Sequence, residues 1–209
     1  MLFFKNQKLS KAFFSLSFLL GFTFLLSAQG TAYQIAEGST TTIKGTSSFH
    51  DWAASVGEFS GQLQLSEAFN ATKAKALKVE KIALSFQVAS MDGGRGAAMN
   101  KKIFAALKST EHPVISFDVA EAQVAAIQKT ADGFTLDITG TLKMAGVAKP
   151  VSLSLKGMQS ADGQLSFAGE YPMKMSTFDI EPPSAMFGQI VTGDDITIVF
   201  DLKLAESKN

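Results

Sequence analysis

Apolar and polar residues alternate along most of the chain, and residues 133–144 show the pattern most clearly. Phe134, Leu136 and Ile138 fall on one side of this run, while threonine, aspartate and lysine residues fall on the other. A period of two predicts a β-strand with one buried face and one wet face. The same pattern predicts further strands at residues 59–65, 115–119, 151–155, 165–175 and 196–204, after a weaker, threonine-rich first strand at 40–47.

The run at residues 77–88 changes its phase partway along. Leu77 and Val79 stand at odd positions, whereas the apolar residues from Ile82 onward stand at even positions. Because one extra residue moves every following side chain to the other face, a bulge or turn near residues 80–81 is predicted. Residues 97–108 break the strand pattern altogether. Their apolar residues recur at intervals of four, which predicts a short amphipathic helix.

Turn and glycine signals indicate how the strands are arranged. Asp-Gly pairs at residues 132–133 and 162–163 predict hairpins. Glycines inside strands, at positions 45, 61, 140 and 169, indicate bends at barrel corners. About eight to ten antiparallel strands, apolar on one side, can hide that face in a barrel or a sandwich, and the hairpins and glycines favour the barrel. The sequence therefore predicts an all-β fold, a single antiparallel β-barrel of about eight strands with one short amphipathic helix.

The first 28 residues have the composition of a leader. Three lysines precede a nearly unbroken apolar run at residues 12–26, and small residues follow at 27–30. About 15 apolar residues are too few for a comfortable membrane span, so a cleaved secretory signal peptide is predicted at residues 1–28. We expect the processed chain to be a soluble periplasmic protein without an integral membrane segment, with one domain at residues 32–205.

Charge and cysteine content exclude several classes of function. The chain has 19 Lys plus Arg and 19 Asp plus Glu, and loss of the three leader lysines leaves 16 against 19, a net charge of −3. A mildly acidic chain whose one arginine is Arg95 cannot neutralise many phosphates, so nucleic-acid binding is not expected. The absence of cysteine excludes disulfides, thiol catalysis and cysteine-ligated zinc.

Residues that could perform catalysis are few. His50 follows the first predicted strand, and Ser47 and Ser48 stand close to it, but no nucleophile-elbow motif is present. A histidine that bonds backbone at a barrel rim is the simpler interpretation. Asp194 and Asp195 lie in a Thr-Gly-Asp-Asp segment, which is more typical of a turn than of a calcium loop.

A glycine-rich loop, residues 91–96, runs directly into the predicted helix and contains Arg95. Backbone N–H groups at a helix N-terminus form a generic anion site, and an arginine offers a bidentate fork for phosphate. A mobile loop with one solvated charge is the alternative.

The strand patterns point a set of large apolar side chains into one interior. A small barrel can be packed solid by such side chains or can enclose a ligand. The inward set is Phe59, Leu63, Leu84, Phe86, Phe117, Phe134, Leu136, Leu153, Phe167, Tyr171, Ile198 and Phe200.

Four parts of the chain, taken in order, form a recognisable set. They are GTSSFHDW (residues 45–52), MNKKIFAALKSTEHPVISF (99–117), GTLKMAGVAKPVSLSL (140–155), and the ending FDIEPPSAMFG (178–188) with TGDDITIVFDL (192–202). Together they resemble the YceI family of exported, lipocalin-like, polyisoprenoid-binding proteins. Many members carry an acidic residue where this chain has Asn100.

The resemblance implies a lipocalin-like barrel with an apolar channel that takes an isoprenoid chain. It implies a non-enzymatic binding or carrier protein for a polyprenyl phosphate, a quinone or another long-chain lipid, with no cofactor besides that ligand. The inward set would line the channel around the lipid tail, and Arg95, Asn100 and His50 are candidates for contact with the head group. Two alternatives remain open: an enzyme that acts on such a lipid with His50 as base, and a solid-core structural or partner-binding barrel.

Overall fold

The computed structural model describes residues 30–207 of the 209-residue chain, so the predicted signal peptide lies outside the described residues. Strands dominate, with one α-helix, α1 (Ala97–Ala106), and two short 3-10 turns, η1 (Val88–Ser90) and η2 (Met175–Phe178). No helix within residues 30–207 is long and apolar enough to cross a membrane. The strands are β1 (Thr31–Ile35), β2 (Thr40–Ser47), β3 (Trp52–Val56), β4 (Phe59–Leu65), β5 (Ala76–Gln87), β6 (Met91–Asp92), β7 (Val114–Val119), β8 (Gln123–Ala126), β9 (Gln128–Thr130), β10 (Gly133–Met144), β11 (Val147–Gln159), β12 (Leu165–Lys174), β13 (Ser184–Ala185) and β14 (Ile190–Glu206).

Eight antiparallel strands close into a barrel in the order β1-β4-β5-β7-β10-β11-β12-β14, and β14 pairs back with β1. Closure leaves the ring without a free edge, as an antiparallel sheet with one apolar face requires. The predicted all-β barrel with a single helix is therefore confirmed.

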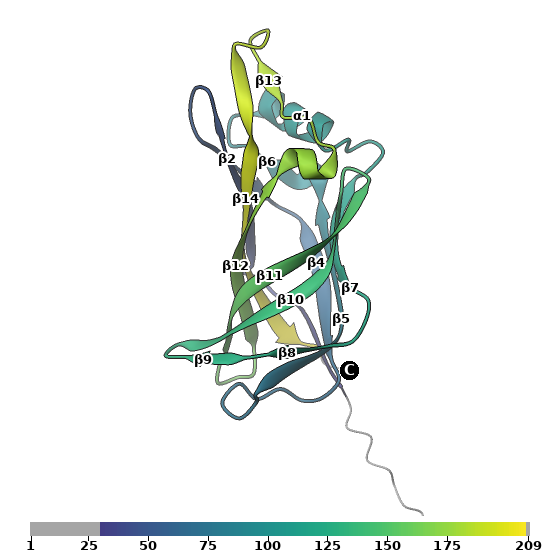
Figure 1. Cartoon of the computed structure of the whole chain (residues 1–209), viewed down its shortest axis with the longest axis vertical. Coiled ribbons are helices and arrows are strands. Elements are labelled where there is room, and N and C mark those ends of the chain that lie inside the picture. Colours follow the sequence, from purple (N-terminus) through teal and green to yellow (C-terminus); the bar gives the residue numbers. More distant parts are fainter. Residues whose placement is uncertain (1–29, 208–209) are drawn as a thin grey trace, which may run out of the picture.

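Parts of the barrel wall consist of two strands placed end to end. β1 and β2 both run antiparallel to β14, opposite residues 204–206 and 192–201 respectively. On their other sides, β1 pairs with β4, which in turn pairs with β5, while β2 pairs with β3, which in turn pairs with β6. The barrel is consequently long and narrow (Figure 1). We call the end that carries α1, β13 and the β2–β3 loop the helix end; the C-terminus lies at the other end.

The predicted change of phase in β5 is a bulge. Gln64 of β4 pairs with Lys81, but the next residue, Leu65, pairs with Val79, which leaves Glu80 without a partner in the ladder. The extra residue keeps the apolar side chains on both sides of it pointing into the barrel.

Glycines inside the strands make room for aromatic rings from neighbouring strands. A Cβ on Gly140 would lie 2.5 Å from the Phe117 ring, and one on Gly169 would lie 2.8 Å from the Phe200 ring. These spacings are far shorter than van der Waals contact, so the rings fill the space that the missing side chains leave. Close approach of a ring therefore explains Gly140 and Gly169, and bending at barrel corners stays a prediction.

Asp194 and Asp195 do not form the predicted turn. β14 continues through them, and its pairing with β2 shifts register between Thr192 and Ile196. Asp194 accepts hydrogen bonds from the backbone N–H (2.8 Å) and hydroxyl (2.7 Å) of Ser176, and Asp195 pairs with Lys174 at 2.8 Å. The hydrogen bonds from Ser176 lower the pKa of Asp194 below its ordinary value.

Candidate functional site

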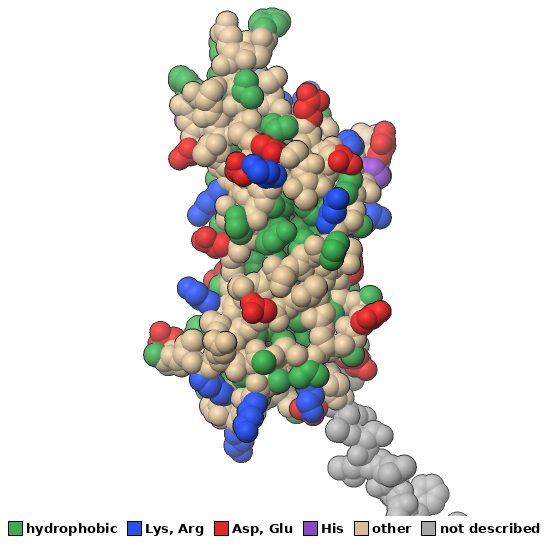
Figure 2. All heavy atoms as spheres, viewed as in Figure 1, with side chains coloured by type: hydrophobic (Ala, Val, Ile, Leu, Met, Phe, Trp, Pro, Cys, Tyr) green, Lys and Arg blue, Asp and Glu red, His purple; other side chains and the backbone are tan. Residues whose placement is uncertain are grey.

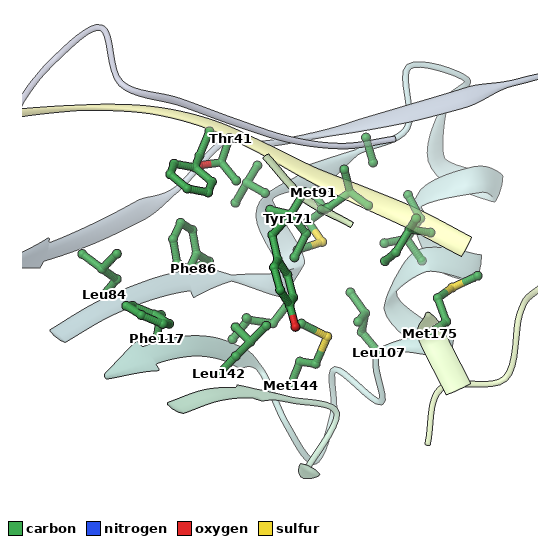
Figure 3. A pocket seen from close by; sticks show the side chains of 18 of the residues that line it. Thr41, Leu84, Phe86, Met91, Leu107, Phe117, Leu142, Met144, Tyr171 and Met175 are labelled. Carbon is green, nitrogen blue, oxygen red and sulfur yellow. The ribbon is translucent and has the colours of Figure 1, made fainter. Parts of the chain in front are cut away.

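A cavity of about 370 Å³ lies inside the barrel, within the range typical of ligand sites. Its lining runs from Leu77 and Leu204, near the C-terminal end, to Ser184 and Ile190 at the helix end. The side chains around it are almost all aliphatic, aromatic or methionine, and Figure 3 shows them converging from several strands. The cavity is therefore long, apolar and aligned with the barrel, so the barrel is not packed solid.

Ten of the twelve residues predicted to face the interior border this cavity. Strict alternation predicts them correctly because every second residue of a barrel strand points inward. Contact of these residues with a lipid tail stays a prediction. The ten are Leu63, Leu84, Phe86, Phe117, Leu136, Leu153, Phe167, Tyr171, Ile198 and Phe200.

Phe59 and Phe134 do not border the cavity. Phe134 is fully buried and packs edge-on against Phe69 and Phe167, with ring centroids 5.4 and 6.2 Å apart. The Phe59 ring stacks on Phe86 at 5.7 Å, and it is the Phe86 ring that meets the cavity. Both residues thus pack against the cavity wall instead of forming its surface.

Several polar side chains interrupt the apolar wall, among them Thr41, His50 and Tyr171. Thr41 is 6% exposed, and its hydroxyl oxygen has no hydrogen-bond partner. The Nδ1 atom of His50 is likewise buried without a partner, and both residues border the cavity. The Tyr171 hydroxyl reaches into the cavity towards Met144 (Figure 3). Buried polar groups without partners cost about 1–3 kcal/mol each, so a ligand that bonds to them would recover that energy.

Two cationic side chains border the cavity at the helix end. Arg95, from the glycine-rich loop, is exposed, while Lys102 of α1 is half-buried and its Nζ donates to the Ser184 carbonyl oxygen at 3.1 Å. The sequence analysis missed Lys102. Its position three residues after Met99 and four before Ala106, which also border the cavity, could have indicated it.

Asn100 acts within the protein. Its Oδ1 accepts a hydrogen bond from the Gly93 N–H at 2.9 Å, and Asn100 does not border the cavity. The Gly94 N–H is bonded in the same way to Asp92 Oδ1 at 2.9 Å. Two of the backbone donors expected for an anion are therefore already engaged by the protein's own oxygens, which leaves Arg95 as the main donor in this loop.

The serines beside His50 bond to backbone. Ser47 Oγ donates to the His50 carbonyl oxygen at 2.7 Å and accepts from the His50 N–H at 3.2 Å. Ser48 Oγ accepts from the Val191 N–H at 3.1 Å. Among the hydrogen bonds of residues 30–207, none joins either serine to the His50 ring, so the contact that a serine nucleophile needs is not formed.

The fold and this cavity define a closed β-barrel with an internal apolar chamber. The chain belongs to the YceI-like domain family, whose pattern matches residues 33–204. The predicted family is therefore confirmed.

Solved structures with the same fold show how widely the sequence can vary. Burkholderia cenocepacia BcnA is 22% identical, with a TM-score of 0.60, and the match covers 79% of this chain and 95% of that one. A polyisoprenoid binding domain from Saccharophagus degradans, described as implicated in plant cell wall breakdown, is 12% identical, with a TM-score of 0.61 and coverages of 84% and 98%. The Campylobacter jejuni YceI protein is 19% identical, with a TM-score of 0.52 and coverages of 75% and 85%. Among curated proteins, no relative matches this chain.

Proposed function

We propose that this protein is a non-enzymatic, periplasmic binding or carrier protein that holds a long-chain isoprenoid-type lipid inside its barrel. The observation that carries the proposal is the apolar cavity, which runs along the barrel and reaches the helix end. The polyisoprenoid binding domain from Saccharophagus degradans has the same fold and supports this choice of ligand.

The energy of burial favours a long tail over a short one. Each five-carbon isoprene unit contributes roughly 4 kcal/mol when fully buried, from about 0.8 kcal/mol per carbon. Association itself costs roughly 4–15 kcal/mol, so one or two units barely offset it. Several units in a row would bind well, and a cavity lined from Leu77 to Ile190 has the extended shape that such a chain needs.

The head group is proposed to lie at the helix end. Arg95, Lys102 and His50 border the cavity there, and each can donate a hydrogen bond. Arg95 and Lys102 suit a phosphate, whereas the unpartnered Nδ1 of His50 suits a neutral oxygen such as that of a quinone. The Thr41 hydroxyl lies farther along the barrel, opposite Phe200, and does not belong to this group. Asn100 can contribute only its Nδ2 group, because its oxygen is bonded to Gly93.

A carrier fits the site better than an enzyme does. A hydrolase would need an activated nucleophile beside His50, and the hydroxyl of Ser47 is directed to a backbone carbonyl. The cavity supplies burial along its whole length and few groups that could transfer a proton. Shielding a tail from water requires only this apolar wall.

The proposal is tested by titrating delipidated protein with a series of isoprenoid alcohols of increasing length. Affinity should rise at least about tenfold for each added isoprene unit until the cavity is filled, and then level off. The same series measured on the Leu153→Asp variant, whose substitution faces the cavity, should bind far more weakly. Affinity that does not depend on tail length would contradict the proposal.

A further inference from the structure

Large apolar side chains are exposed together at the helix end. Of the six most exposed in residues 30–207, four lie there: Phe49 (75% exposed), Met186 (63%), Phe187 (fully exposed) and Val191 (49%). Single exposed apolar residues are ordinary, but a cluster marks an interaction site. In the space-filling view, several hydrophobic side chains lie on the surface at this end of the molecule (Figure 2). We call these four residues the apolar tip.

The two loops that form the apolar tip are joined. The Ser48 N–H donates to the Val191 carbonyl oxygen at 2.9 Å, and the Val191 N–H donates to Ser48 Oγ at 3.1 Å. Phe49, next to Ser48, is therefore held beside the β13–β14 hairpin. The apolar tip is one surface built from two parts of the chain.

Phe187 also has a backbone conformation that is unfavourable for phenylalanine. The Gln189 N–H bonds to the Met186 carbonyl oxygen at 3.2 Å and closes a tight turn, in which Phe187 and Gly188 have φ of 56° and 86°. A turn of this kind favours Asn, Asp or Gly at the position of Phe187. A phenylalanine there gains no burial and occupies a disfavoured conformation, so folding alone does not explain it.

The apolar tip adjoins the cavity and a group of cations. Ser47, His50, Ser184 and Ile190, from the same two loops, border the cavity. Residues 183–192 carry no charge, whereas residues 93–110 carry Arg95, Lys101, Lys102 and Lys108 and no carboxylate. The hydrogen bond from Lys102 to Ser184 places Lys102 beside the β13–β14 hairpin, and α1 lies at the same end of the barrel as the tip (Figure 1). The acidic residues that flank these segments are Asp51, Asp92, Glu111, Asp179, Glu181, Asp194 and Asp195. Of these, Asp194 is hydrogen-bonded to Ser176 and Asp195 is paired with Lys174.

We propose that the apolar tip inserts into the outer layer of an anionic phospholipid bilayer, with the basic segment 93–110 against the head groups. Aromatic and methionine side chains backed by lysine and arginine suit such an interface, because the apolar part enters the acyl boundary while the cations meet the phosphates. Docking brings the cavity to the membrane, where a lipid ligand is taken up or released. That consequence rests on the proposed function, but docking itself is measured without a ligand.

The test is flotation of the processed, ligand-free chain with vesicles made of equal parts phosphatidylglycerol and phosphatidylcholine. The variant Met186→Ser/Phe187→Ser should lower partition at least about tenfold, because two exposed apolar anchors are lost. The matched control is Val124→Ser/Met158→Ser, which removes two exposed apolar side chains outside the tip and should leave partition unchanged. Vesicles of phosphatidylcholine alone should bind the wild-type protein more weakly. Added salt should also weaken binding to the anionic vesicles.

Absence of vesicle binding by wild type, or equal binding by the tip variant, would overturn the proposal. Capture of another protein by the tip without vesicle binding would assign the surface to a protein partner and would also overturn it. The isoprenoid titration on the tip variant separates the two proposals. If wild type and the tip variant bind isoprenoids equally well but wild type does not float with vesicles, only the docking proposal is wrong. If wild type floats with vesicles but binds no isoprenoid, the proposed ligand is wrong.

Discussion

Val151 gives the sharpest test that the inner face of the barrel is an apolar chamber. It is 6% exposed, lies on β11 opposite Gly140 and borders the cavity. Replacement by aspartate changes the shape of the side chain little but puts a carboxyl group into the cavity wall. Ser152, the next residue on the same strand, is exposed on the outer face and provides the matched control, Ser152→Asp.

The expected effect on stability depends on pH. An ionised carboxylate in an apolar wall costs several kcal/mol, so the Asp introduced at position 151 should have a pKa raised above its unfolded value of about 3.9. The folded state then holds its proton more tightly than the unfolded state does, so stability falls as pH rises between those two pKa values. The loss is about 1.4 kcal/mol per pH unit, or about 2.7 kcal/mol from pH 5 to pH 7 if the folded pKa exceeds 7.

Urea unfolding of both variants at pH 5 and pH 7 measures this difference. Val151→Asp should be less stable than wild type at both pH values and should lose further stability at pH 7. Ser152→Asp should stay close to wild type at both. If the stability of Val151→Asp depended on pH as little as that of the control, the introduced side chain would lie in water, and residue 151 would not face an apolar chamber.

Four further predictions follow from individual contacts. Arg95→Ala should weaken a polyprenyl phosphate about ten- to one-hundredfold in a binding titration, and should leave a quinone with the same tail almost unchanged. Gly140→Ala should lower the free energy of unfolding by about 1–3 kcal/mol, because the new methyl group meets the Phe117 ring; a smaller loss would show that the ring moves freely. The pKa of Asp194 is lowered in the folded state, so its stabilising contribution is complete above the unfolded pKa and is lost as pH falls through the folded one; Asp194→Asn should show a smaller loss of stability on acidification than wild type. N-terminal sequencing of the exported form should start near Gln29 or Thr31, and a retained leader in the membrane fraction would instead show an anchor.

Alternation of residues is enough to predict the barrel and most of its inner surface. It fails to separate Phe134 from Phe117, because both point inward and only the packing of Phe69 and Phe167 decides that Phe134 does not reach the cavity. The bulge at Glu80 was predictable since the phase of the pattern records it directly.

Other features depend on contacts between distant parts of the chain. The segment with Asp194 has the composition of a turn, but Asp195 pairs with Lys174 of β12, and Thr192 and Ile196 pair with β2 before and after it, so the strand continues. Lys102 reaches the cavity because α1 covers the helix end, and the exposure of Phe187 follows from the tight turn between β13 and β14. The spacing of Lys102 from Met99 and Ala106 is a local signal for its side of the helix, but the strand at Asp194 and the exposure of Phe187 leave no such signal.

Mass spectrometry of the organic extract of protein purified from its natural cell envelope tests the central claim most directly. The account predicts an isoprenoid-type lipid with several isoprene units, present in wild type and depleted in Val151→Asp but retained in Ser152→Asp. Wild-type protein that carries no lipid, and that also binds none on titration, would contradict it.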